Sequence, residues 1–169
     1  MKQLIQKMKT DTKSPPRPDS IHILLSWIGG TIGISIIALL SKTLDYPLIM
    51  APFGASCVLL FGAPESPFSQ PRNLIGGHLI SSFVGLLILS FFGNDWYLLG
   101  IAVATSIALM QLTKTTHPPA GADPIVILMG NADWKFLLTP ALSGSLILLV
   151  LALVFNNLIK NRQYPKFWR

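Results

Sequence analysis

The stretch T-H-P-P-A-G-A-D-P at Thr116–Pro124 decides the fold, because it places a proline- and glycine-rich break between apolar segments. Irregular backbone inside a bilayer leaves N–H and C=O groups unpaired unless protein or a polar cavity surrounds it. We therefore expect this break to lie inside a membrane protein and to mark its functional site.

Composition also predicts a membrane protein. Hydrophobic residues make up 51% of the 169 residues and charged residues 12%, whereas soluble domains carry about 25% charged residues. The net charge of +6 does not indicate nucleic-acid binding, because the basic residues flank the apolar segments, as in a topology signal. We expect one transmembrane domain at residues 20–159, between cytoplasmic tails at 1–19 and 160–169. The single Cys57 supports neither a disulfide nor a thiolate metal site.

The expected fold class is an all-α membrane protein. A helix needs about 20 mostly apolar residues to span a bilayer, and four segments approach this length: Ile21–Leu40, Leu74–Phe92, Trp96–Leu112 and Phe136–Phe155. Two apolar segments, Pro47–Phe61 and Pro118–Met129, are shorter and interrupted. The sequence therefore predicts four full spans and two short broken helices.

The two broken segments resemble each other. Residues 52–56 (PFGAS) align with residues 119–123 (PAGAD), and each match lies between two full spans. This order predicts a duplicated unit of span, broken segment and span, over Ile21–Phe92 and Trp96–Phe155. A unit repeated after three passages is inverted in the membrane, as in many secondary transporters.

Charge distribution favours six passages over four. If both short segments cross, only Lys42 and Lys135 lie outside, and 11 of the 13 Lys and Arg residues lie inside. If both segments re-enter, Arg72 and Lys114 also move outside and nine basic residues remain inside. The positive-inside bias selects the six-passage topology, with both termini cytoplasmic.

Small residues recur at helical spacing in the four spans. Such residues allow close approach of helix backbones in a bilayer, so we expect them to pack helices and not to bind ligand. They are Gly29 and Gly33; Gly77, Ser81 and Gly85; Gly100, Ala104 and Ala108; and Ala141 and Ser145.

Each broken segment places a short polar residue before an apolar run, Ser56 in the first and Asp123 in the second. Asp followed by Pro is a strong helix start, so half-helices are expected to begin at both positions with their positive dipole ends facing a shared centre. Such ends favour an anion. Capping of its own helix is favoured for Asp123 over direct ligand contact, because a carboxylate would repel the anion.

His117 precedes two prolines, which force extended backbone, so it is expected at an exposed or cavity-lining bend. Together with Lys114, Thr115 and Thr116 it offers a cation, hydroxyl donors and a titratable group, which suits a small oxyanion or its conjugate acid. A role in the site is favoured for His117 over that of a satisfied structural histidine. For Lys114, a site role and a topology anchor stay equally open.

Two further residues are secondary candidates. Arg72 is either a charge that attracts the anion or an interfacial anchor. His78 lies inside a span, where an ionisable group is a functional hypothesis by default, although an imidazole bonded to a helix carbonyl would also be satisfied. His22 is expected at the interface. Three scattered histidines without paired cysteines make a poor case for a metal site or a hydrolase.

The motif at Thr116–Pro124, together with A-P-F-G-A-S at Ala51–Ser56, resembles the HPP family of integral membrane proteins, named for His-Pro-Pro. The resemblance extends over about residues 20–158. It implies a small membrane protein of about four predicted spans. Because plant and cyanobacterial members are associated with nitrite transport, it also implies nitrite as the leading substrate. No Ser- and Arg-rich transit peptide is evident, which favours a bacterial inner membrane.

The sequence thus predicts a transporter or channel for a small monovalent anion, with no enzymatic activity, cofactor or metal. A structural or accessory subunit and a membrane enzyme are the alternatives. Expected partners are the lipid bilayer and a small inorganic anion but not nucleic acid, and a homo-oligomer stays open. The expected site residues are Gly54, Ala55, Ser56, Lys114, Thr116, His117, Gly121, Ala122 and Asp123, with Arg72 and His78 as secondary candidates.

Overall fold

A computed structural model describes residues 1–168 of the chain. The regular secondary structure of those residues is entirely helical, and they contain no β-strand. The α-helices are α1 (Lys2–Lys7), α2 (Ser20–Thr43), α3 (Pro52–Cys57), α4 (Pro71–Phe92), α5 (Trp96–Leu112), α6 (Asp123–Gly130) and α7 (Ser143–Leu158). Short 3-10 or π-helical segments are η1 (Val58–Gly62), η2 (Pro67–Ser69), η3 (Pro118–Ala122), η4 (Trp134–Leu137) and η5 (Leu138–Leu142). The expected all-α class is confirmed.

The predicted spans coincide with long helical segments. Three are long and apolar enough to cross a membrane, at Ser20–Thr43, Pro71–Phe92 and Trp134–Leu158. The fourth, α5, has 17 residues, about 25 Å at 1.5 Å per residue. Local signals explain the starts: Asp19 caps α2 by accepting from the His22 N–H at 2.6 Å, and Pro71 occupies the first position of α4.

The last span is not the single helix expected over Phe136–Phe155. It consists of η4, η5 and α7, and Thr139 within it has extended dihedrals (φ −144°, ψ 115°). Pro140 follows, and a proline both lacks an N–H and disfavours helical backbone in the residue before it. The helix is therefore interrupted near its start.

Both short segments are continuous helical stretches. α3 runs directly into η1, and η3 runs directly into α6. A half-helix does begin at Asp123, as predicted, but the expected start at Ser56 is wrong, because α3 begins at Pro52 and contains Ser56. The predicted capping role of Asp123 is also wrong, because its Oδ2 bonds His78 and Ser82 and its Oδ1 bonds no group.

Hydrogen bonds place the two ends of the first short segment beside opposite ends of α2. The Leu48 N–H donates to Ser41 Oγ (3.2 Å) near the C-terminus of α2. His22 Nε2 bonds the carbonyl of Gly62 (2.8 Å) near the N-terminus of α2. Residues 48–62 therefore run antiparallel to α2 along most of its length, from one end of the molecule to the other.

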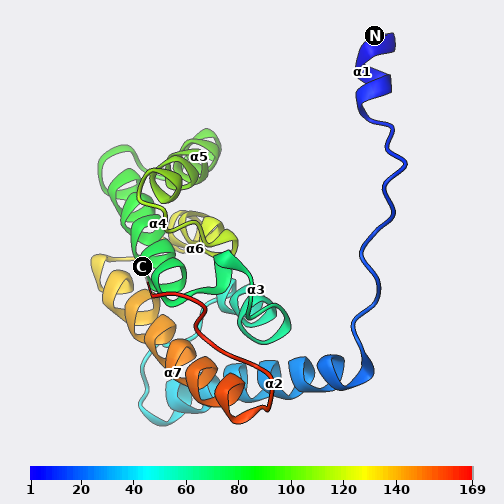
Figure 1. The fold of residues 1–169 in the computed structure, drawn as a ribbon. Helices are drawn as coiled ribbons and strands as arrows, with labels where there is room; N and C mark the ends of the chain where they lie inside the picture. The colour runs from blue at the N-terminus through cyan, green and yellow to red at the C-terminus, as the bar shows by residue number, and fades with distance from the viewer. Residues whose placement is uncertain (169) are drawn as a thin grey trace.

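The second short segment runs the length of its neighbours in the same way. Arg72, at the N-terminus of α4, donates to the carbonyl of Thr113 just before this segment (2.6 Å). Asn94, between α4 and α5, donates to Asn131 Oδ1 just after it (3.0 Å). We call the end with His22, Arg72 and Arg162 the basic end. Figure 1 shows α3 and α6 side by side in the middle, with α2 beyond α3 and α5 beyond α6.

Most of the predicted small-residue faces do pack closely. A Cβ built on Gly33 would lie 2.9 Å from the ring of Phe61, and one on Gly85 would lie 2.9 Å from Pro124 Cα. On α5 the prediction is wrong, because Gly100, Ala104 and Ala108 are exposed. The buried face of α5 carries instead Leu98, Ala102, Ser106 and Met110.

The two terminal segments differ. Residues 1–20 are exposed throughout, and α1 stands apart from the helical body (Figure 1). The segment after α7 packs against the basic end: Tyr164 is 2% exposed and its hydroxyl donates to the carbonyl of Ser69 (2.7 Å). Arg162 donates to the carbonyl of Phe61 (3.2 Å). Residues 162–166 thus pack onto the helical body.

Candidate functional site

Four buried polar side chains meet where the short segments cross α4. Ser56 Oγ lies 3.0 Å from His78 Nε2 and 2.9 Å from His117 Nε2. His78 Nδ1 lies 2.8 Å from Asp123 Oδ2. Ser56, His78, His117 and Asp123 are all 0% exposed. We call these four residues the central cluster.

Two further groups extend the cluster. The Ser82 hydroxyl donates to Asp123 Oδ2 at 3.0 Å, and His117 Nδ1 donates to the carbonyl of Phe68 at 2.7 Å. Phe68 belongs to η2 at the basic end and its side chain is 42% exposed. A continuous row of hydrogen bonds therefore runs from the buried carboxyl of Asp123 to a surface segment.

The small face of α4 brings the cluster together. Gly77 adjoins His78, and a Cβ built on Gly77 would lie 2.6 Å from His117 Cβ and 3.1 Å from the carbonyl oxygen of Thr115. Only glycine allows the His-Pro-Pro segment this close to α4. The edge-to-face packing of the His78 and His117 rings, with centroids 5.0 Å apart, follows from this approach.

Backbone carbonyls of the motif are tied to α4 as well. Asn73 Nδ2 donates to the carbonyl of Thr116 (2.8 Å), and the Ser81 hydroxyl donates to the carbonyl of Ala120 (2.5 Å). These bonds tie carbonyls of the His-Pro-Pro segment to α4, and irregular backbone inside a membrane protein requires such partners.

Asp123 has one unpaired oxygen. Its Oδ2 bonds His78 and Ser82, whereas Oδ1 is the one buried side-chain nitrogen or oxygen without a hydrogen-bond partner among the described residues. A buried polar atom without a partner is costly. This oxygen is therefore a place where a bound molecule or a proton would be favourable.

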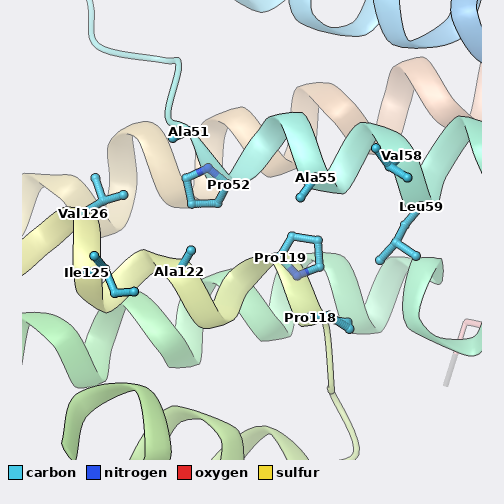
Figure 2. A pocket seen from close by; sticks show the side chains of 10 residues that line it. All are labelled: Ala51, Pro52, Ala55, Val58, Leu59, Pro118, Pro119, Ala122, Ile125 and Val126. Atoms are coloured by element: carbon cyan, nitrogen blue, oxygen red, sulfur yellow. The ribbon is translucent and has the colours of Figure 1, made fainter. Parts of the chain in front are cut away.

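A groove of about 700 Å³ opens beside the central cluster, between the two short segments. Figure 2 shows Pro52 and Ala55 on one side and Pro119 and Ala122 on the other. Every lining side chain is apolar; the remaining ones are Ala51, Val58, Leu59, Pro118, Ile125 and Val126. The residues that precede Ser56 and Asp123 in the chain thus face the groove.

The structure separates the predicted site residues into three groups. Ser56, His117 and Asp123 contact one another or share His78. Ala55 and Ala122 line the groove. The others lie outside both places: Gly54 is exposed, Thr116 and Gly121 face a cavity toward α5, and Lys114 is exposed with a positive φ of 58°. His117 is fully buried and not exposed at a bend.

The secondary candidates have contrasting surroundings. Arg72 donates to the carbonyl of Thr113 at the C-terminus of α5, where a cation is also favoured by the helix dipole. This contact supports an anchoring role. His78 links Ser56 to Asp123 at the centre of the cluster. The sequence signal for it was an ionisable residue inside a span, but nothing in the sequence pointed to its partner 45 residues away.

The cluster can exchange protons and form hydrogen bonds. No group of three or more His, Cys, Asp or Glu side chains in residues 1–168 is placed to hold a metal ion. Imidazole, hydroxyl and carboxyl groups in one row offer both donors and acceptors, and intramembrane groups of this kind mark ion pathways and proton relays.

Comparisons with known proteins place the chain in a family. Residues 15–165 match the model of the HPP transmembrane region. Two transmembrane proteins of Dictyostelium discoideum are 40% and 39% identical, over 92% and 98% of this chain but only 59% and 57% of their own lengths. The chain thus spans less than two thirds of either relative. No solved structure matches. The matched span includes the His-Pro-Pro segment and the whole central cluster, and the chain belongs to the HPP family of membrane proteins.

Proposed function

We propose that this protein carries a small monovalent anion across a membrane, through the region where the two short segments meet, and that nitrite is the leading candidate for that anion. The observation that carries this proposal is the central cluster, four polar side chains at 0% exposure between apolar helices. Ionisable groups inside a membrane domain are rare and line substrate or ion pathways. Nitrite itself is taken from the resemblance to plant and cyanobacterial members of the family.

The proposed membrane arrangement has six passages in two inverted units, with the basic end in the cytoplasm of a bacterial cell at its inner membrane. It is supported by the course of both short segments from one end of the helical body to the other. The positive-inside bias supports the orientation, because Lys42 and Lys135 are the only basic residues among the described residues 1–168 that fall toward the opposite end.

Thiol labelling tests this arrangement. In a Cys57→Ser background, Lys135→Cys should react in intact cells with an impermeant maleimide, and Lys114→Cys should react only after the cells are opened. Reaction of Lys114→Cys in intact cells would show that the second short segment does not cross.

Transport is tested with purified protein in liposomes. Nitrite uptake should exceed that of protein-free liposomes, be inhibited by nitrate or formate, and be the same with sodium or potassium as the cation. Uptake that follows the cation would exclude an anion transporter. Full uptake by Ser56→Ala, His78→Gln and His117→Gln alike would favour the structural or accessory subunit.

A membrane enzyme is the second candidate, because Ser56, His78 and Asp123 follow the hydrogen-bond order of a serine hydrolase triad. Two observations favour transport over hydrolysis. Ser56 is completely buried and also bonds His117, and it lies inside α3, where helical hydrogen bonds use the neighbouring N–H groups that would have to stabilise an oxyanion. Covalent labelling of Ser56 by a fluorophosphonate would reverse this preference.

A further inference from the structure

We propose that the central cluster is a proton relay, which moves one proton with each transported anion. This inference rests on the anion transport proposed above and adds its coupling to protons. The relay consists of Asp123, His78, Ser56 and His117, in that order, and ends at the carbonyl of Phe68.

The three hydrogen bonds from His78 to the Phe68 carbonyl each have a fixed direction. The carbonyl of Phe68 can only accept, so Nδ1 of His117 carries a hydrogen, and Nε2 of the neutral ring accepts. The Ser56 hydroxyl therefore donates its one hydrogen to His117 Nε2 (2.9 Å), which lies closer than its other acceptor, the Pro52 carbonyl (3.3 Å), and it accepts from His78 Nε2–H. These tautomers are assigned from the bonding partners.

One proton is then shared between Asp123 and His78. With Nε2 of His78 protonated, Nδ1 either accepts from a neutral carboxylic acid or, as an imidazolium, donates to a carboxylate. In both cases the pair has no net charge, which suits its complete burial. A carboxyl and an imidazole that share one proton 2.8 Å apart can exchange it without a change in the net charge of the pair.

A proton can pass along the row in four balanced steps. Asp123 Oδ2–H transfers its proton to His78 Nδ1, and His78 Nε2–H transfers its own to Ser56 Oγ. The Ser56 hydroxyl proton moves to His117 Nε2, and the Nδ1 proton of His117 leaves at the Phe68 carbonyl toward water. Each relay atom that loses a hydrogen belongs to a group that gains one, apart from Asp123, which becomes a carboxylate. The net result is one proton moved from Asp123 to the basic end, with both imidazoles left in their other tautomer; rotation of the two rings restores the starting tautomers before the next proton passes.

The two ends of the relay suit this task. The relay reaches the protein surface at η2, where Phe68 is partly exposed. At the buried end of the relay, Asp123 Oδ1 lacks a hydrogen-bond partner among the described residues and is free to accept the next proton from a bound acid. The adjacent groove is apolar, and an apolar groove accommodates the uncharged acid of the substrate at lower desolvation cost than its anion.

Few other charges adjoin the relay. Besides the relay residues themselves, α3 carries the thiol of Cys57, and α4 carries Arg72 near its N-terminus. No charged residue lies within α5 or α7, or in α6 after Asp123. The residues just before η2 and after α7 carry the ion pair of Glu65 with Lys166 (3.4 Å), and Lys114 is exposed before the His-Pro-Pro segment. The one histidine outside the relay is His22 at the basic end, where it bonds the Gly62 carbonyl and lies beside Arg162.

Ser56 offers the sharpest test, because its hydroxyl is the one link between the two imidazoles. Nitrite uptake into proteoliposomes is measured with and without an imposed proton gradient, acid outside, and protein-free liposomes give the passive crossing of the acid. The wild type should be accelerated by the gradient. Ser56→Ala should lose that acceleration, with coupled uptake reduced by roughly 100-fold, whereas Ser56→Thr should keep it.

Ser81→Ala is the matched control, since Ser81 is also a fully buried serine near the motif but bonds only the Ala120 carbonyl. It should respond to the gradient like the wild type. Wild-type uptake that ignores the gradient, or Ser56→Ala that responds fully, overturns the relay.

Histidine ¹⁵N NMR in lipid separates failure of the relay from failure of the transport proposal. The wild type should show the Nδ1–H tautomer for His117 and the Nε2–H tautomer for His78, and Ser56→Ala should perturb both rings while Ser81→Ala does not. If nitrite is not transported but these tautomers are found, the substrate is wrong and the relay stands. An Nε2–H tautomer of neutral His117 would overturn the relay whatever the substrate.

Discussion

Gly77→Ala should loosen the contact that brings the His-Pro-Pro segment onto α4. The added Cβ would lie 2.6 Å from His117 Cβ and 3.1 Å from the Thr115 carbonyl oxygen. Neither atom is the end of a flexible side chain, so rotation about a side-chain bond cannot relieve the clash. To restore an ordinary contact of 3.4 Å, the segment must retreat by roughly 0.8 Å.

The expected cost follows from overpacking. Extra methyl groups forced into packed interiors typically cost about 1–3 kcal/mol, and each kcal/mol shifts Tm by roughly 2–4 °C in a protein of this size. Gly77→Ala should therefore lower Tm by about 2–12 °C. Gly100→Ala, in the exposed face of α5, is the matched control, because nothing lies within 4 Å of the built Cβ; its Tm should not fall.

The assay is thermal unfolding of the purified protein in detergent, followed by tryptophan fluorescence, with nitrite uptake measured on the same preparations. Retreat of His117 would also lengthen its 2.9 Å bond to Ser56, so uptake should fall together with Tm. If Gly77→Ala is as stable and as active as Gly100→Ala, the close approach at α4 does not exist as described.

Two further substitutions probe other contacts. Gly144→Ala should destabilise at least as much as Gly77→Ala in the same unfolding assay, because its Cβ would overlap the ring of Phe53 and lie 2.8 Å from a backbone carbonyl, whereas Gly30→Ala, with open space, should be neutral. Burial raises the pKa of Tyr164 above its usual value of about 10. The unfolded state then ionises first, so the stability of the wild type is full below pH 10 and declines as pH rises above it. Tyr164→Phe should lack this part of the decline in Tm measured between pH 9 and 11, and identical pH profiles would contradict the burial of Tyr164.

Sequence reasoning located the helices well, because apolar length is a strong signal when lipid is the solvent. It also identified the small face of α4, where Gly77 and Gly85 contact the second short segment. It was wrong about α5, where Gly100 and Ala104 point outward. Small-residue spacing marks a face that permits close packing, but the partner helix decides whether that face is used.

The central cluster was only partly predictable. Ser56, His117 and Asp123 were expected to meet because the two broken segments resemble each other, and the observed distances bring them together. The central place of His78 could not be derived, since its partners are 22 and 45 residues away in the chain. The accepting carbonyl of Phe68 left no signal, because every residue has a carbonyl.

The failure of the capping prediction for Asp123 explains why these side chains are available for chemistry. Because η3 runs directly into α6, the Asp123 N–H already donates to the Ala120 carbonyl, and the start of α6 needs no side-chain cap. Its carboxyl group is free to reach across to His78 and Ser82. Ser56 is released similarly, since α3 begins four residues earlier at Pro52. Short helical segments that continue one another thus need no side-chain cap, even though the Ser56 hydroxyl also lies 3.3 Å from the Pro52 carbonyl. The glycine face of α4 then brings these polar side chains together.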